Sequence, residues 1–405
     1  MNLDAIRSQF PALDRMHAGL PVAYFDAPGG TQVPRVVAKA MTDYLFHHNA
    51  NTHWLYPTSA ETDAILLGTR EAVADLLNGK ASEIVFGNNM TTLTFHLARA
   101  LGRMWSEGDQ VIVTELDHHA NVAPWRALAV DRGIEVRMAR LIPETAQLDY
   151  EHLASLVTER TKLIAVGGAS NALGTINDLP RVVKMARDAG ALTFVDAVHL
   201  VPHELVDVQA LGCDFLACSS YKFYGPHAGI LWGRYDLLET IPLPKLAPAP
   251  DHAPERGETG TQNHEGIAGI GATVEFLASL GGDEGTRRDR LRRAFASLHE
   301  EGSRSLRLLW DGLSAIEKVR VYGPPPTERR TPTLSFTLDG ATSDDVARAL
   351  AARGIFASNG DFYATTIVDR YNLHSLVRVG CGCYTTEEEV RRLIDAVGAV
   401  ARGAH

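Results

Sequence analysis

Leu192–Pro226 reads LTFVDAVHLVPHELVDVQALGCDFLACSSYKFYGP, and this stretch decides the fold. The apolar runs Leu192–Val195 and Phe215–Cys218 within it are predicted strands. The first run ends at Asp196, and the second leads into a turn of small residues that carries Lys222. Short apolar runs that alternate with helical patterns predict a mostly parallel sheet with helices on both faces.

Asp196 and Lys222 follow neighbouring strands, where mostly parallel sheets bind their ligands. An amine and a carboxylate held apart in this way suit pyridoxal phosphate. The amine forms a Schiff base with the cofactor aldehyde, and the carboxylate keeps the pyridine nitrogen protonated. Taken singly, each residue is better explained as a solvated loop Lys or a helix-capping Asp. Taken with the candidates below, the two favour the cofactor.

The composition predicts a soluble protein of the size of many enzymes, rather than a protein that binds nucleic acid or membranes. Its 405 residues, 45% hydrophobic, predict one large domain and one smaller domain. The net charge is -10 and no Lys/Arg run stands out, so no nucleic-acid partner is expected. No apolar run has the length of a membrane span or a signal peptide, which predicts a cytoplasmic location. The four cysteines, Cys213, Cys218, Cys381 and Cys383, form no CxxC pair, and no metal site is expected. We expect them to be buried thiols of a protein in a reducing compartment.

The remaining apolar runs extend the same pattern and then change character. Five further strands are predicted, which makes seven in the large sheet: Ile84–Phe86, Val111–Val113, Ile134–Met138, Leu163–Val166 and Ile230–Trp232. Beyond a long helical pattern at Asp283–Gly312 the chain predicts a small α+β unit. We therefore expect three parts, namely an N-terminal segment (1–20) that packs with the small domain, a large domain (21–285) and a small domain (286–405).

Two loops after predicted strands carry candidate cofactor ligands. Gly87–Thr92, with Met90 and Thr91, follows a strand and opens a helix, as a phosphate site requires, although an ordinary helix cap explains it equally well. His118 follows the strand Val111–Val113, where an imidazole can stack on a pyridine ring and carry protons. The alternatives for His118 are a solvated loop or a zinc pair with its neighbour, and neighbouring His residues rarely share a metal.

Asn171 and Arg378 are candidate substrate ligands. Asn171 lies in a turn after another strand, where its amide can contact the cofactor's phenolic oxygen and a substrate carboxylate, or simply form the turn. Arg378 stands among apolar residues in the tail and needs a carboxylate, from a substrate or from a structural salt bridge.

These motifs together resemble the class V aminotransferase group of fold-type I pyridoxal phosphate enzymes, most closely the larger, sulfur-mobilising cysteine desulfurases. The similarity runs from Phe25 to the last helix. It rests on His-His-Ala-Asn, Ser-Asn-x-Leu-Gly-Thr, Val-Asp-Ala and Ser-x-x-Lys-x-Tyr-Gly-Pro. The chain also looks like a desulfurase-like subfamily of uncharacterised function, with FDAPGGTQVP near its start and NMTTLTF at its phosphate helix.

The resemblance implies a role for each matching residue. Lys222 forms the Schiff base, Asp196 pairs with the pyridinium, and His118 stacks on the ring. The phosphate is bound at Thr91 and Ser219, and the substrate carboxylate at Asn171 and Arg378. His199 stands where the family usually has a Gln that contacts the phenolic oxygen. Thr261 matches a Thr that reaches the neighbouring subunit's phosphate, which implies a homodimer with a shared active site. Met90 and Tyr221 complete the expected set of cofactor contacts.

The departures from the family decide the expected reaction. Tyr363 stands at the position of the Cys that attacks the substrate sulfur, Ser358 replaces an Arg that often precedes that loop, and Tyr221 replaces a His. A Tyr cannot form a persulfide, although its ring can also merely fill the volume of the loop. We therefore expect Cα deprotonation of a small amino acid followed by β-elimination, with Tyr363 among the catalytic residues. An aminotransferase or epimerase would use the same residues, and a non-catalytic sensor that retains the cofactor is the alternative of another class.

Overall fold

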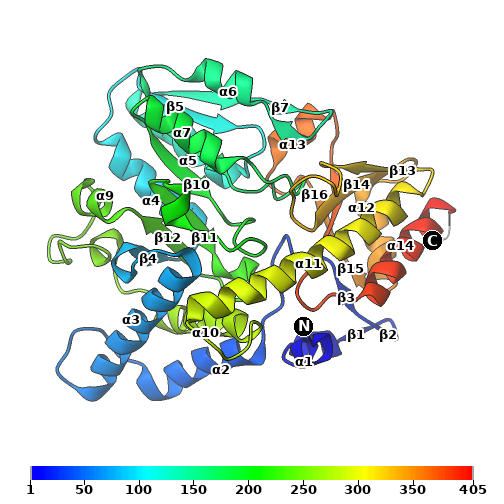
Figure 1. Cartoon of the computed structure of the whole chain (residues 1–405), viewed down its shortest axis with the longest axis horizontal. Coiled ribbons are helices and arrows are strands. Elements are labelled where there is room, and N and C mark those ends of the chain that lie inside the picture. The colour runs from blue at the N-terminus through cyan, green and yellow to red at the C-terminus, as the bar shows by residue number, and fades with distance from the viewer. Residues whose placement is uncertain (1, 404–405) are drawn as a thin grey trace.

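Seven strands form the main sheet, in the order β4-β12-β11-β10-β9-β5-β6 (Figure 1). The computed structural model describes residues 2–403. β12 runs antiparallel to both of its neighbours, and the other pairings in the sheet are parallel. The predicted α/β class with a mostly parallel seven-stranded sheet is therefore confirmed. The strand bounds are Ile84–Gly87 (β4), Gln110–Thr114 (β5), Glu135–Ala139 (β6), Thr161–Gly167 (β9), Leu192–Asp196 (β10), Phe215–Ser219 (β11) and Gly229–Gly233 (β12).

Helices cover both faces of this sheet because successive strand residues point to opposite sides. Ile112 and Ile164 pack in one apolar cluster, whereas Val113 and Leu163 pack in a second one. Each cluster continues into the helices on its side of the sheet. The helices of this part of the chain are α2 (Arg35–Asp43), α3 (Pro57–Leu77), α4 (Met90–Gly102), α5 (Ala123–Arg132), α6 (Tyr150–Leu156), α7 (Leu179–Asp188), α8 (Val208–Leu211), α9 (Tyr235–Thr240) and α10 (His264–Ser279).

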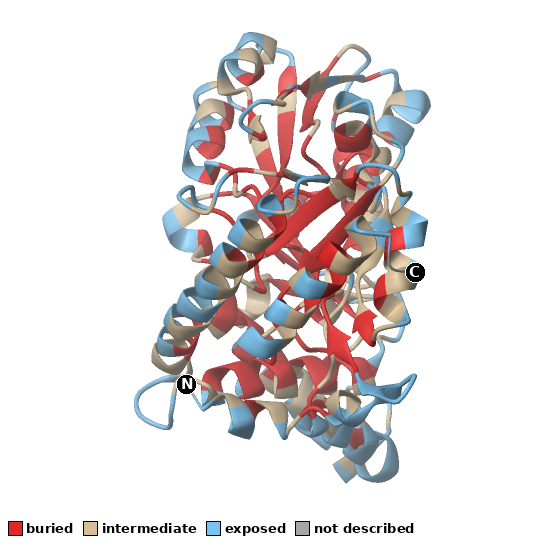
Figure 2. Cartoon of the chain, turned by 90° about the vertical axis from the view of Figure 1, so that its right-hand side faces the viewer, coloured by how far each residue is buried: buried red, intermediate tan, exposed pale blue. Residues whose placement is uncertain are grey.

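A second sheet of four strands, β13-β14-β17-β16, lies beyond the long helix α11 (Arg287–Ser314), which crosses Figure 1 diagonally. A third apolar cluster joins α11 to this sheet and to the last helix. Figure 2 shows the buried central strands with exposed helix faces outside them. The bounds here are Val319–Tyr322 (β13), Thr333–Leu338 (β14), Ser358–Gly360 (β16), Leu376–Gly380 (β17), α12 (Ser343–Ala351), α13 (Thr365–Arg370) and α14 (Glu387–Ala401).

Residues 2–24 contact the C-terminal part of the chain. β3 (Ala23–Tyr24) pairs in parallel with β15 (Ile355–Phe356). Arg7, in α1 (Leu3–Arg7), forms an ion pair with Glu389 at 3.0 Å. The Phe10 ring packs against both Tyr384 of the C-terminal part and Phe276 of the large core. The segment thus touches both parts, and the division at residues 20 and 285 stays a prediction.

Some helices and strands of the structure were not predicted from the sequence. No helix was expected between residues 34 and 77, where the structure has α2 and α3. The buried side of α3 includes Ser59, Thr62, Thr69 and Arg70, so its apolar residues do not form a clean stripe. The short pairs β1 (Met16–His17) with β2 (Leu20–Pro21) and β7 (Leu141–Ile142) with β8 (Gln147–Leu148) also carry too little pattern to predict. Within residues 2–403, no helix is both long and apolar enough to cross a bilayer.

Candidate functional site

The carboxyl ends of β9, β10 and β11 open into a cavity of about 470 Å³. Nine of the predicted site residues line it: Met90, Thr91, His118, Asn171, Asp196, His199, Ser219, Tyr221 and Lys222. A second cavity, of about 510 Å³, shares the wall made by Thr91, His118, Asn171, Tyr221 and Lys222 and adds Phe362, Tyr363 and Arg378. We call the first the cofactor cavity and the second the substrate cavity.

Lys222 stands at the boundary of the two cavities, in the single turn Ser220–Lys222 that follows β11. Its Nζ donates hydrogen bonds to the carbonyls of Pro28 at 2.6 Å and Gly29 at 3.0 Å. Burial, with a smaller contribution from the Arg378 cation, lowers the pKa of Lys222 to about 7. A large share of this amine is therefore unprotonated, and nucleophilic, at neutral pH.

Asp196 ends β10 and is buried on the floor of the cofactor cavity. One of its carboxylate oxygens accepts a hydrogen bond from the Val198 N–H at 3.0 Å. Burial raises the pKa of Asp196 to about 6, against the opposing effect of the Lys222 cation. A cationic group placed in the cavity would reverse the effect of burial and hold Asp196 ionised.

The first turn of α4 lines the cofactor cavity. Asn89 caps the helix by accepting the Thr92 N–H at 2.9 Å, and the Met90 N–H donates to Ser219 Oγ at 3.0 Å. Gly229 lets β12 approach this turn, because a Cβ there would lie 2.4 Å from the carbonyl carbon of Asn89. Backbone N–H groups at a helix N-terminus beside hydroxyls suit a phosphate.

His118 lines both cavities as a neutral ring. Burial and the cations Lys222 and Arg378 lower its pKa to about 4. Its Nδ1 accepts a hydrogen bond from the Ala120 N–H at 3.0 Å, so the ring proton is at Nε2. Within residues 2–403, no group of three His, Cys, Asp or Glu side chains is arranged to hold a metal ion.

Arg378 is a buried cation at the substrate cavity. Within residues 2–403 no carboxylate lies within the 4.0 Å of an ion pair with it, so the structural salt bridge considered from the sequence is not formed. Its Nη1 donates to the Asn171 carbonyl at 2.9 Å, and its Nε is buried without a partner. Burial lowers the pKa of Arg378 to about 9, although Asp26 acts in the opposite direction. A carboxylate supplied from outside would satisfy this group.

The loop between β16 and α13 closes the substrate cavity. The Phe362 carbonyl accepts a hydrogen bond from Asn171 Nδ2 at 2.9 Å, and the Tyr363 carbonyl accepts one from the His119 N–H at 2.7 Å. The Phe362 ring lies 4.1 Å from the Arg378 guanidinium. Phe362 and Tyr363 both have left-handed backbone conformations, with φ of 57° and 55°. The Tyr363 side chain is 69% exposed, with its ring 5.5 Å from that of His118.

Several lining residues were not predicted from the sequence, and the aromatic ones among them are Phe362, His119 and His227. Phe362 lies beside Arg378, and His227 stacks on Tyr221 with 4.9 Å between ring centroids. A single aromatic residue in a loop gives no signal of such a contact, although the position of Phe362 next to Tyr363 could have suggested it. Thr261 is exposed and lines neither cavity of its own chain.

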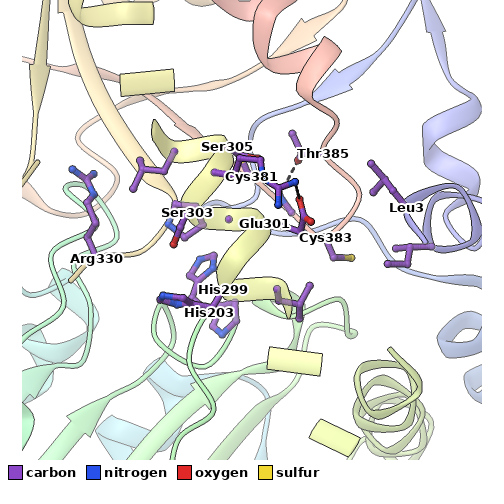
Figure 3. Close-up of a pocket in the computed structure, with 18 of the residues that line it drawn as sticks. Leu3, His203, His299, Glu301, Ser303, Ser305, Arg330, Cys381, Cys383 and Thr385 are labelled. Carbon is purple, nitrogen blue, oxygen red and sulfur yellow. Dashed lines mark hydrogen bonds and ion pairs between the residues drawn. The ribbon is translucent and has the colours of Figure 1, made fainter. Parts of the chain in front are cut away.

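None of the four cysteines lines either cavity. Cys381 and Cys383 line a separate cavity of about 270 Å³ beside α11, together with His203 and His299 (Figure 3). Burial raises the pKa of each of these two thiols to about 12. Neither is therefore a thiolate near Lys222 at neutral pH.

The cofactor cavity fits pyridoxal phosphate by its donor set. It offers a buried amine of lowered pKa at Lys222, a buried carboxylate at Asp196 and a helix N-terminus with the Ser219 hydroxyl beside it. The volume of about 470 Å³ is in the range of small-molecule and cofactor sites.

Comparison with known proteins agrees with this geometry. The family profile described as "Aminotransferase class-V" matches residues 23–393. A "Cysteine desulfurase" of Pectobacterium carotovorum subsp. carotovorum (strain PC1) is 32% identical over 416 residues, covering 99% of this chain and 98% of that protein. A "Probable cysteine desulfurase" of Streptomyces coelicolor is 31% identical, with 98% and 96% covered.

Two solved structures are similar over nearly the whole chain. The apo cysteine desulfurase of Thermococcus onnurineus NA1 has a TM-score of 0.89 at 27% identity, with 99% of this chain and 98% of that chain covered. The cysteine desulfurase CsdA of Escherichia coli, in an S-sulfonic acid form, has a TM-score of 0.85 at 28% identity, with 100% and 99% covered. The chain therefore belongs to the class V aminotransferase family and is a pyridoxal phosphate-dependent enzyme with the fold of the cysteine desulfurases.

Proposed function

We propose that this enzyme removes the Cα proton of a small amino acid and then eliminates a leaving group from Cβ, without a protein persulfide. The observation that carries the proposal is Arg378, a buried cation without a carboxylate partner among residues 2–403, which donates to the Asn171 backbone carbonyl and lines the cavity that Lys222 shares. This arrangement supports an α-carboxylate as the group that the substrate presents.

The chain's own residues provide the remaining steps. When bound, the cofactor supplies an electron sink for the carbanion at Cα. With the cofactor bound, the Lys222 amine would take the Cα proton, because its lowered pKa leaves a large share of it unprotonated at neutral pH. The Tyr363 hydroxyl is the proton donor that we assign to the leaving group, and the position of its ring, which lines the substrate cavity beside His118, supports this role.

The absence of a persulfide step rests on Tyr363 and on the cysteines. A phenol has an ordinary pKa of about 10 and offers no product comparable to a persulfide. None of the residues that line the cofactor cavity or the substrate cavity is a cysteine. Leaving groups such as a thiol, sulfinate, selenide or sulfoxide depart from Cβ without a protein thiol.

The test is a panel of amino acids assayed with the purified holoenzyme. Cysteine, cysteine sulfinate, selenocysteine and S-methylcysteine sulfoxide are incubated, and pyruvate, ammonia, the departing group and amino transfer to an oxo acid are each measured. Pyruvate and ammonia in equal amounts, abolished by Lys222→Ala and with a raised KM in Arg378→Lys, are expected. Amino transfer without pyruvate would favour an aminotransferase over elimination, and racemised substrate without pyruvate would favour an epimerase. The absence of any product with every substrate would favour the non-catalytic sensor.

We further propose a homodimer with a shared active site. Segment 45–56 exposes Leu45, Phe46, Trp54, Leu55 and Tyr56, and a cluster of large apolar side chains in one segment supports a protein interface. The exposed Thr261 is available to a second subunit, since it contributes to neither cavity of its own chain.

A further inference from the structure

The buried ring of His199 connects the cofactor cavity to the small sheet. His199 follows β10 and lines the cofactor cavity, and its Nε2 lies 2.9 Å from Thr333 Oγ1 and 3.3 Å from Thr331 Oγ1. Thr333 begins β14, and both threonines are fully buried. Two hydroxyls from a distant part of the chain therefore meet one nitrogen of a ring that faces the cofactor.

The hydroxyl protons determine which nitrogen of His199 carries its proton. A buried hydroxyl needs an acceptor for its hydrogen. Thr331 Oγ1 has one in the Gly174 carbonyl at 3.4 Å. Within the described part of the chain, the His199 Nε2 is the only hydrogen-bond partner of Thr333 Oγ1. Both hydroxyls are satisfied when Thr333 donates to Nε2, which leaves Nε2 without a proton.

The surroundings of His199 keep the ring neutral. Burial lowers its pKa well below the usual value, and the titratable groups that act on it are the bases His203, Arg378, Lys222 and His118. A neutral ring with an unprotonated Nε2 has its proton at Nδ1. No described residue is a hydrogen-bond partner of Nδ1, and the ring lines the cofactor cavity. His199 thus presents an N–H donor to the cavity.

We propose that Thr333 is a positioning residue that fixes the Nδ1–H tautomer of His199, so that the histidine donates a hydrogen bond to the phenolic oxygen of the cofactor. A donor at that oxygen favours its anionic form. It therefore lowers the pH at which the imine between Lys222 and the cofactor loses its proton. The amide of a Gln at position 199 would donate in the same way without any tautomer to fix.

The first test is a pH titration of the visible absorbance of the holoenzyme. Thr333→Val keeps the shape and the β-branched side chain but removes the hydroxyl, so we expect the midpoint of the colour change to rise by about one pH unit. Thr333→Ser should restore the wild-type midpoint. Thr331→Val is the matched control and should leave the midpoint unchanged, because Thr331 donates to Gly174 rather than to His199.

A double-mutant cycle separates this role from a merely structural one. In a His199→Gln background, Thr333→Val should no longer move the midpoint. An equal shift in both backgrounds, or no shift in either, would overturn the proposal. If Thr333→Val loses the cofactor, ¹⁵N-histidine NMR of the cofactor-free protein decides instead, with His199→Gln identifying the signal. An unprotonated Nε2 in the wild type and a changed tautomer in Thr333→Val support the proposal, and a protonated Nε2 in the wild type refutes it.

Discussion

The Lys222 amine differs from an ordinary surface lysine in its charge at neutral pH. Burial lowers its pKa from 10.5 to about 7. Below pH 7 the amine is protonated and unreactive, and above pH 7 it is mostly free. The rate at which added pyridoxal phosphate forms the imine with cofactor-free protein should therefore rise with pH through a midpoint near 7. Stopped-flow absorbance measures this rate, Lys222→Ala is the control without a signal, and a midpoint near 10 would contradict the prediction.

The charge of Asp196 can be removed with little change of shape. Asp196→Asn should retain the cofactor but lose turnover by about 10²–10³-fold or more, because the ring nitrogen no longer has a buried anion beside it. Activity is measured at saturating cofactor, with occupancy followed by absorbance. Asp188→Asn, on the exposed end of α7, is the control and should be close to wild type. Turnover near that of the wild type in Asp196→Asn would remove the residue from its assigned role.

At the scale of elements, the loop between β16 and α13 is held by its backbone rather than by the tip of Tyr363. The carbonyls of Phe362 and Tyr363 accept the hydrogen bonds from Asn171 and His119, and no hydrogen bond of the Tyr363 hydroxyl is among those of the described residues. Tyr363→Phe should therefore change the free energy of unfolding by no more than about 0.5 kcal/mol and leave the cofactor spectrum intact.

The same variant tests whether the hydroxyl takes part in the reaction. If Tyr363 protonates the leaving group, Tyr363→Phe should reduce turnover by roughly 10²-fold or more. Tyr235→Phe, at the start of α9, is a matched control for the loss of a phenol. Unchanged turnover in Tyr363→Phe would show that the ring only fills the loop. In either case, incubation with cysteine should leave no persulfide on the protein by mass spectrometry, and one mapped to Cys381 or Cys383 would contradict the assigned chemistry.

The sequence predicted the elements that carry strong local patterns and missed the contacts between distant ones. Phe215–Cys218 is a continuous apolar run and Leu192–Val195 is interrupted only by Thr193, a pattern typical of buried strands, and both lie within strands of the structure. The helix α3 buries Arg70, which forms an ion pair with Glu258 at an N–O distance of 2.9 Å. Because polar residues such as Arg70 lie on the buried side of α3, the helix has no clear apolar periodicity, and it could not be predicted from the sequence. No local pattern relates His199 to Thr333, because the contact joins residues 134 positions apart.

For the whole molecule, the exposed segment 45–56 gives the most direct test of assembly. Leu55 and Phe46 are among its exposed apolar side chains, so Leu55→Asp should weaken a dimer that buries them. Sedimentation velocity should show a dimer for the wild type. The variant should dissociate into monomers at a higher protein concentration than the wild type does, and it should lose cofactor when it dissociates. Val130→Asp, on the distant and exposed face of α5, is the control. A wild-type monomer with full activity would end the proposal of a shared site.

Thr261→Ala addresses the shared site without disturbing the surface. Thr261 is exposed in the single chain, so its removal should have little effect on stability. If it reaches the partner's phosphate, the dimer should persist while its affinity for the cofactor falls by roughly tenfold, as expected for one lost hydrogen bond to a charged group. Equilibrium dialysis of pyridoxal phosphate against wild type and variant measures this difference, and equal affinities would place Thr261 outside the site.

The pairing of β3 with β15 has a consequence for biosynthesis on the ribosome. Ala23 and Tyr24 find their strand partners at Ile355 and Phe356, which are translated some 330 residues later. At about 5–20 residues per second, the nascent chain carries an unpaired strand for roughly 15–70 s. The contact is among the most non-local in the fold, and such contacts slow folding. Premature release of the chain before residue 356 would leave this edge open to other exposed strands, so truncated products should be more prone to aggregation than the complete polypeptide.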